Sequence, residues 1–203
     1  MSTVTDLKTD KYESNRRDAI RAAASVFAAK GYHGASTSDI ATELGIKQGS
    51  LYHYIKSKEE ALYEVCILGI EDYVSRMKSI ASSRQSPEAK LLAVVTSHLA
   101  SYREKNEAMK VHNDERLYLP KERRGELKRL GTLYRTLLEE ILQAGIDAGT
   151  YRSDIDIEFV AKTIIGVCNS WGHHLVRYPD LDMFEVVQKC ADYFVHGLVE
   201  TTS

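Results

Sequence analysis

Apolar side chains recur at steps of three and four residues along nearly the whole chain, and this spacing places them on one face of an α-helix. No segment alternates apolar and polar residues with the Val, Ile and Thr content typical of a β-strand. The pattern therefore predicts an all-α protein of about nine helices, without an internal repeat. The predicted helices cover approximately residues 15–30, 37–44, 48–55, 58–80, 87–103, 106–114, 120–144, 157–171 and 183–198.

Residues that cap helices mark several of these predicted starts. Ser36 lies three residues before Asp39, the spacing of a capping box, in which the serine oxygen accepts a free backbone N–H. Ser57 has the same relation to Glu60. Side chains able to cap in this way precede three further predicted helices: Ser86, Asp156 and Asp182.

Composition and charge limit the class of protein. The chain has 43% hydrophobic and 28% charged residues, which is typical of a folded globular protein and excludes a disordered tail protein. The longest apolar run spans residues 91–95, so we expect neither a transmembrane helix nor a secretory signal. Three widely spaced cysteines suit a reducing cytoplasm, which is the predicted location. Because the net charge is −2, any contact with DNA must be local.

The two short helices predicted within residues 36–55 have the spacing of a helix-turn-helix. Only residues 45–47 separate them, and a glycine turn of this length crosses two helices steeply. The second helix presents Gln48, Ser50 and Tyr52 away from its apolar face, formed by Leu51 and Ile55. An amide, a hydroxyl and an aromatic ring can reach base edges in a DNA major groove. Taken singly, each of these residues is explained equally well by packing or solvation.

Neighbouring residues are candidates for contacts with DNA phosphates. The predicted helices that begin near residues 37 and 58 direct free N–H groups outward, and such groups bind anions. Lys47 stands at the cap position of the second short helix, where it cannot accept an N–H, and a nearby phosphate would offset that cost. The predicted DNA-binding residues are Thr37, Ser38, Lys47, Gln48, Gly49, Ser50, Tyr52, His53, Tyr54 and Lys58.

Together with Phe27, Gly31 and Tyr32, residues 36–41 and 45–60 closely resemble the amino-terminal DNA-binding domain of the TetR family of bacterial transcriptional regulators. Two positions depart from the family pattern, since Ile55 replaces an aromatic residue and Lys47 replaces a Ser or Thr.

The resemblance implies a DNA-binding domain at residues 13–73, with its helix-turn-helix at 36–55, and an effector-binding and dimerisation domain at 74–203. It also implies a homodimeric repressor on a palindromic double-stranded DNA operator. A small-molecule effector would release it by changing the angle of the helix predicted at 58–80.

In the resembled family, the last two helices of each subunit form a four-helix bundle. The last two predicted helices here carry apolar lines that suit such a bundle, although an intramolecular core explains the same spacing almost as well. The predicted dimer-interface residues are Val160, Ile164, Phe184, Val187, Ala191, Phe194 and Leu198.

Residues 113–117, 145–149 and 166–171 more loosely resemble the branch of the family that senses acyl-coenzyme A thioesters. Such an effector needs cations for its phosphates and an apolar tunnel for its acyl chain. Six cations lie between residues 116 and 129, close to the apolar line that includes Tyr134. The predicted effector-binding residues are Arg116, Arg123, Tyr134, Asn169 and Trp171.

Other interpretations of this region stay open. The cations also fit a solvated helix face paired with Glu122 and Glu126, and Trp171 also fits a core position. A multidrug-type repressor that senses an uncharged or cationic hydrophobic compound is the alternative. No cofactor other than the effector is expected.

Catalysis is a remote alternative, in the form of a small thioesterase-like enzyme. On a helix, the offsets from Cys168 to His173 and from Cys190 to His196 separate the side chains by about 140° and about 120°. The adjacent His173 and His174 diverge by about 100° and cannot chelate one ion unaided. Without an HExxH, P-loop or GxSxG motif, we predict no catalytic residue and no metal site. A helical adaptor that never touches DNA is equally remote.

Overall fold

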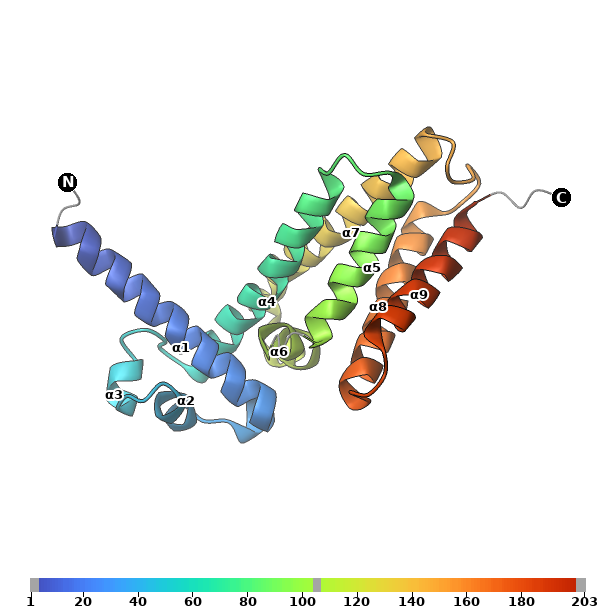
Figure 1. Ribbon diagram of the computed structural model, residues 1–203. Coiled ribbons are helices and arrows are strands. Elements are labelled where there is room, and N and C mark those ends of the chain that lie inside the picture. Colours follow the sequence, from blue (N-terminus) through green and yellow to red (C-terminus); the bar gives the residue numbers. More distant parts are fainter. Residues whose placement is uncertain (1–3, 104–106, 200–203) are drawn as a thin grey trace. The chain divides into compact units, whose positions relative to one another are not determined.

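The computed structural model describes residues 4–103 and 107–199, and this part of the chain is helical, without a strand (Figure 1). The all-α prediction is confirmed. The helices are α1 (Val4–Gly34), α2 (Thr37–Glu43), α3 (Gln48–Leu51), α4 (Lys58–Ala81), α5 (Pro87–Arg103), α6 (Glu107–Glu115), α7 (Gly125–Asp147), α8 (Ile157–Arg177) and α9 (Met183–Leu198), with short 3₁₀ helices η1 (Arg116–Tyr118) and η2 (Lys121–Arg124).

The predicted caps account for the starts of several helices. At the start of α2, the Asp39 backbone N–H donates to Ser36 Oγ at 3.1 Å and the Ser36 N–H donates back to the Asp39 carboxylate at 2.8 Å. The side chains of Asp156 and Asp182 accept the first N–H groups of α8 and α9. At the start of α4 the capping box differs from the prediction, because the Glu60 carboxylate accepts the backbone N–H of Lys56 in place of that of Ser57.

Several elements differ from the prediction. The helix expected at 15–30 runs from Val4 to Gly34, and Gly31 inside it is not helical. The helix expected at 48–55 ends at Leu51, and a turn follows in which the Tyr54 N–H donates to the Leu51 carbonyl at 2.8 Å. The helix expected from residue 120 begins instead as η2, and α7 starts at Gly125. A local tightening to 3₁₀ geometry is common at helix ends and leaves the apolar spacing unchanged, so periodicity alone does not detect it.

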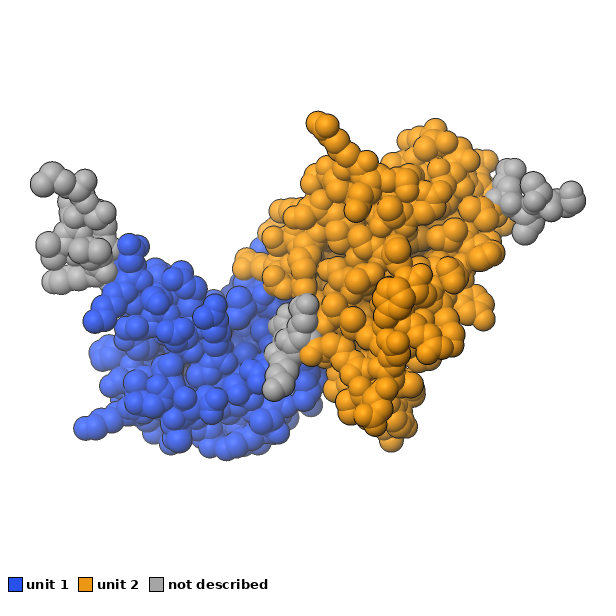
Figure 2. All heavy atoms as spheres, viewed as in Figure 1, with its two compact units in different colours: residues 1–70, 107–127 blue, residues 71–106, 128–203 orange. Residues whose placement is uncertain are grey.

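The chain forms two compact units (Figure 2), one of residues 1–70 and 107–127 and the other of 71–106 and 128–203. Unit 1 has its core at fully buried side chains such as Phe27, Ile40 and Leu51, which come from α1, α2 and α3. In unit 2, α5 packs against both α8 and α9. The predicted domain boundary at residues 73 and 74 stays a prediction, and the units add that residues 107–127 belong with the helix-turn-helix.

A close approach of α4 and α6 explains why residues 107–127 group with unit 1. A Cβ on Gly69 of α4 would lie 2.7 Å from the Ala108 carbonyl oxygen, so only glycine fits without a shift. One turn earlier on α4, the Cys66 carbonyl accepts from Nδ1 of the buried His112 at 3.1 Å. Within residues 4–103 and 107–199, no helix has the length and apolar content needed to cross a membrane.

Candidate DNA-binding surface and effector site

The polar face predicted for the recognition helix is exposed and partly organised by internal hydrogen bonds. Gln48 Nε2 donates to Thr37 Oγ1 at 2.9 Å, and the same Oγ1 lies 3.3 Å from the hydroxyl of Tyr52. The side chains of Lys47 and Ser50 are exposed, and within the described residues no side-chain hydrogen bond engages them. Lys47 makes no cap contact, as its chemistry predicted. This face is free to meet another molecule.

The turn after α3 is fixed to α1 by residues that the sequence analysis missed. The Tyr12 hydroxyl donates to the His53 carbonyl at 3.0 Å, and Asn15 Nδ2 donates to the Tyr54 hydroxyl at 3.2 Å. The rings of Tyr12 and Tyr54 lie 5.6 Å apart. Tyr54 therefore holds the motif against α1. Tyr12 and Asn15 continue the stripe that includes Ala19 at helical spacing, so this signal was present in the sequence.

Lys58 has a structural role that the sequence did not predict. Its Nζ donates to the carbonyl oxygens of Tyr32 and Ala35, each at 3.0 Å, and lies 4.5 Å from the centre of the Tyr32 ring. These carbonyls belong to the bend after Gly31, whose φ of 69° interrupts α1. Glu115 of α6 accepts the Tyr32 N–H at the same bend. Two of the three Lys58 donors thus hold the connection into α2, and contact with a DNA phosphate stays a prediction.

We expect Lys58→Met to lower the free energy of unfolding of unit 1 by about 2 kcal/mol, because two carbonyls lose a charged donor. Urea denaturation followed by far-UV circular dichroism measures this change. The exposed Lys56 supplies the matched control, Lys56→Met, which should leave the transition nearly unmoved. Equal stabilities of the two variants would contradict this role for Lys58.

The five predicted effector-binding residues are divided between the two units. Arg116 and Arg123 lie in unit 1, where Arg116 donates to carbonyls at the end of α6 and Arg123 Nε lies 3.0 Å from Glu59. Trp171 lies in unit 2 on the outer surface of α8, 39% exposed and edge-on to His174. This surface position contradicts the core position considered for Trp171, and the ligand stack stays a prediction. The cations of residues 116–129 are not simply a solvated face paired with their own helix, since Arg123 pairs with α4.

Tyr134 and Asn169 are brought together by a residue that the sequence analysis overlooked, His98 of α5. Its Nδ1 lies 3.0 Å from the Tyr134 hydroxyl, and its Nε2 lies 2.9 Å from Asn169 Oδ1. The Tyr102 hydroxyl also donates to Asn169 Oδ1, at 3.1 Å. Since Oδ1 can only accept, Nε2 carries the imidazole proton and Nδ1 accepts from Tyr134. We call these four residues, His98, Tyr102, Tyr134 and Asn169, the buried polar cluster.

Burial sets the electrostatics of the buried polar cluster. His98 is only 5% exposed, and desolvation lowers its pKa to about 4, opposed by the hydrogen bond to Asn169 and reinforced by the charge of Arg76. Desolvation likewise raises the pKa of the Tyr134 hydroxyl well above its ordinary value. The imidazole is therefore neutral at pH 7. A polar cluster inside a helical core is suited to orienting one polar group of a largely apolar ligand.

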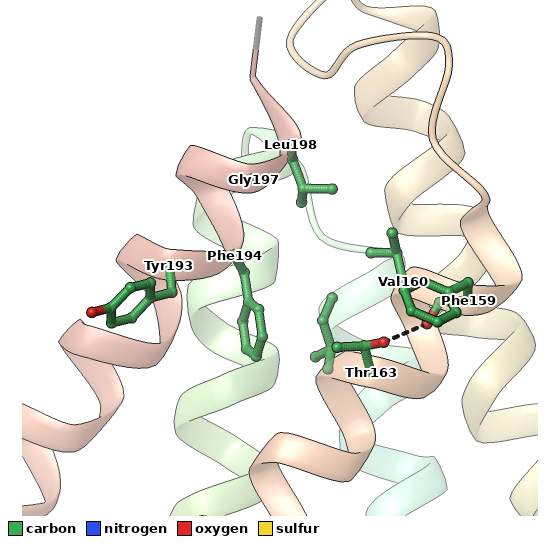
Figure 3. A pocket seen from close by; sticks show the side chains of 8 residues that line it. Phe159, Val160, Thr163, Tyr193, Phe194, Gly197 and Leu198 are labelled. Atoms are coloured by element: carbon green, nitrogen blue, oxygen red, sulfur yellow. Dashed lines mark hydrogen bonds between the residues drawn. The ribbon is translucent and has the colours of Figure 1, made fainter. Parts of the chain in front are cut away.

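The outer surfaces of α8 and α9 form an apolar groove (Figure 3). Phe159 and Tyr193 face solvent, with 67% and 82% of their surfaces exposed. Phe184, near the start of α9, is also exposed. The groove is lined by Phe159, Val160, Thr163, Ile164, Tyr193, Phe194, Gly197 and Leu198.

This geometry divides the predicted dimer-interface residues between two helix faces, and the interface itself stays a prediction. Val187 and Ala191 are buried within the protomer and face its own core, whereas Ile164 and Leu198 are buried but also line the groove. The neighbouring stripe, which includes Phe159, Val160 and Phe194, faces outward. A helix with two adjacent apolar stripes can bury one stripe in the core of its own subunit and the other against a partner subunit. The spacing of apolar residues did not reveal which stripe does which.

The cysteine and histidine pairs considered for catalysis are not brought into contact. Cys168 and Cys190 are buried, and desolvation raises the pKa of the Cys168 thiol to about 12. His173 packs edge-on against Tyr102, and His196 Nδ1 bonds to the carbonyl of Asp192, one turn earlier. Among the described residues, no three His, Cys, Asp or Glu side chains are grouped so that they could hold a metal ion.

A helix-turn-helix with an exposed polar recognition face, followed by a second helical unit, defines a DNA-binding transcriptional regulator. Residues 19–65 match the family described as bacterial regulatory proteins, tetR family, and residues 84–198 match the family described as tetracyclin repressor-like, C-terminal domain. The chain belongs to the TetR family. It is a regulator and not an enzyme.

Proteins similar in sequence to this chain are also named as regulators. The chain is 33% identical over 155 residues to the HTH-type transcriptional repressor KstR2 of Rhodococcus jostii. The aligned residues cover 76% of this chain and 76% of the relative. It is 26% identical to the fatty acid metabolism regulator protein of Bacillus subtilis, covering 72% of this chain and 76% of the relative. The structure of Bacillus subtilis FadR in complex with stearoyl-CoA has the same fold, with a TM-score of 0.78, 23% identity and coverage of 90% and 98% of the two chains.

Proposed function

We propose that the protein is a homodimeric, ligand-responsive repressor that acts in the cytoplasm and is released from a palindromic operator by an acyl-coenzyme A thioester. The exposed Gln48 face of the helix-turn-helix carries the DNA-binding part of the proposal, because its amide and hydroxyl groups have the chemistry of base readers. The name of the Rhodococcus jostii relative supports repression. Repression then consists of occluding a promoter.

The outward stripe on α8 and α9 supports the homodimer. Aromatic side chains as exposed as Phe159, Phe184 and Tyr193, next to an apolar groove, are typical of a surface covered by a partner. A second copy placed on this surface would complete a four-helix bundle. Two helix-turn-helix units in such a dimer read the two halves of a palindrome.

A thioester effector is supported by both halves of its chemistry. Lys128 is an exposed cation of unit 2, and no ion pair within the described residues engages it, so it is available to the phosphates of coenzyme A. The buried polar cluster offers Asn169 Nδ2, a donor without a partner among the described residues, for a carbonyl oxygen. The relative from Bacillus subtilis is named for fatty acid metabolism, and the fold neighbour described above holds stearoyl-CoA.

The effector must bind the DNA-incompetent state more tightly than the DNA-bound state, since a ligand with equal affinity for both shifts nothing. α4 is one continuous helix whose residues 58–70 belong to unit 1 and whose residues 71–81 belong to unit 2. It is therefore one of the covalent routes by which a ligand-dependent change in unit 2 can reach the helix-turn-helix.

Release from DNA tests the proposal. The operator is replaced by a duplex that the protein itself selects from a random-sequence pool, and fluorescence anisotropy follows its release. Medium- and long-chain acyl-coenzyme A thioesters should release the duplex at micromolar concentration, whereas the matching free fatty acids should not, because they lack the phosphates that the cations bind.

A matched pair of variants separates phosphate recognition from general charge. Lys128→Gln should raise the thioester concentration needed for release, while Lys78→Gln, which removes an exposed cation of unit 2 outside residues 116–129, should not. Calorimetry measures the binding of each compound and can show a result that contradicts the proposal. No heat with any thioester, together with binding of an uncharged or cationic hydrophobic compound, would favour the multidrug-type alternative.

A further inference from the structure

Three side chains of the helix-turn-helix form a single hydrogen-bonded row on its exposed face. Gln48 and Tyr52 stand four residues apart around α3, and both contact the hydroxyl of Thr37, the first residue of α2. Gln48 Nε2 donates to Thr37 Oγ1 at 2.9 Å, and the Tyr52 hydroxyl lies 3.3 Å from the same oxygen. Within the described residues, Gln48 Oε1 has no protein partner. The amide is held by its nitrogen, and its oxygen is left open.

We propose that Thr37 is a positioning residue that fixes the orientation of the Gln48 amide, so that Gln48 reads adenine in preference to guanine at one base pair of each operator half-site. This inference rests on the proposed function, because it requires that this face meets DNA. It assigns to Thr37 an action through Gln48, and it names the base that Gln48 selects.

The chemistry of the two purines gives the reason. Adenine presents the N7 acceptor and the N6 amino donor in the major groove, which match one N–H and Oε1 of a glutamine amide. Guanine presents two acceptors, N7 and O6, so Oε1 would face O6 without a hydrogen between them. A free glutamine escapes this conflict by turning its side chain so that both N–H groups of Nε2 face N7 and O6 while Oε1 points away. Discrimination therefore depends on preventing that reorientation.

Thr37 prevents this reorientation because its Oγ1 accepts one of the two N–H groups of Gln48 Nε2. The amide then keeps only Oε1 and its second N–H for a base. Turning both N–H groups toward guanine would break the hydrogen bond to Thr37. The cap of α2 is Ser36, so removing the Thr37 hydroxyl leaves the cap in place.

The test measures base discrimination with the full-length protein on a duplex that it selects from a random-sequence pool. Dissociation constants are compared for that duplex and for variants with a single base-pair change in one half-site. In the wild type, one A·T to G·C change should weaken binding by about 5- to 150-fold, the discrimination expected of a bidentate pair. Gln48→Ala should abolish the penalty at that position alone.

Thr37→Val keeps the shape of the side chain and removes the hydroxyl. It should lose most of the penalty at the Gln48 position and retain the penalties elsewhere, and Thr37→Ser should restore it. In Thr37→Val/Gln48→Ala the discrimination should equal that of Gln48→Ala. Thermal unfolding of each variant verifies that the fold is intact.

Two results would overturn the inference. If Thr37→Val weakens every duplex equally and keeps the A over G preference, Thr37 is a backbone contact only. If Gln48→Ala discriminates as the wild type does, Gln48 reads no base. Failure of the wild type to select any duplex is a different outcome, because it removes the proposed DNA-binding function itself.

Discussion

Replacing Phe159 by glutamate is expected to convert the protein from a dimer into a folded monomer. Phe159 is 67% exposed in the protomer, so a charge at this position costs the isolated subunit little. In a dimer that covers this stripe, the carboxylate would be buried without a partner, which costs several kcal/mol. A two-fold interface repeats the cost, because each change occurs on both subunits. Sedimentation velocity at micromolar concentration measures the result.

A control on unit 1 distinguishes loss of the interface from a general effect of charge. Leu117 is as exposed as Phe159 and lies on η1, so Leu117→Glu should remain dimeric. Phe159→Glu should also lose operator affinity, because a monomer has only one recognition helix and can bind only one half-site. A folded Phe159→Glu dimer would place the subunit interface on another surface.

The placement of the predicted interface residues shows what periodicity can and cannot supply. The spacing of Ile164, Val187 and Phe194 predicts that all three lie on apolar helix faces, and they do. Whether a face meets the subunit's own α5 or a second copy is decided by helices distant in sequence, so local spacing cannot separate the two.

Helix starts were predictable for the opposite reason, since their determinants are local. The Ser36 and Asp39 pair closes its capping box over three residues, and Asp156 and Asp182 cap α8 and α9 in a similarly short span. The predicted α3 was longer than the helix in the structure, because the end of this helix depends on how the following turn is held by Tyr12 and not on its own residues.

The buried polar cluster could be predicted from the sequence only in part. Tyr134 and Asn169 were selected through a family resemblance, but the residue that joins them was not. His98 is 36 residues from Tyr134 and 71 from Asn169, so no local pattern connects the three. A histidine within the apolar line that includes Leu91 and Val95 was nevertheless a visible signal, because an imidazole at a core position needs hydrogen-bond partners.

The same histidine makes the stability of unit 2 depend on pH. The pKa of His98 is about 4 in the folded protein, against 6.5 for an ordinary histidine, chiefly because burial disfavours the charged imidazolium. Between these two values the unfolded chain binds more protons than the folded one, so the free energy of unfolding rises with pH. Stability is fully present above about pH 6.5 and is lost as the pH falls toward 4, by up to about 1.4 kcal/mol per pH unit.

Urea denaturation at a series of pH values, followed by the fluorescence of Trp171, tests this dependence, because the only tryptophan of the chain lies in unit 2 with His98. His98→Gln should lose the part of the slope between pH 6.5 and 4 that His98 contributes, and a remaining part is expected from His112 of unit 1, whose pKa burial also lowers to about 4. Tyr134→Phe is the matched control, since it removes the hydroxyl bonded to Nδ1 but leaves a buried imidazole. It should be less stable at every pH, by about 1 kcal/mol, and keep the slope. A slope that is unchanged in His98→Gln would assign the pH dependence to another group and would mean that His98 is hydrated enough to accept a proton in the folded state.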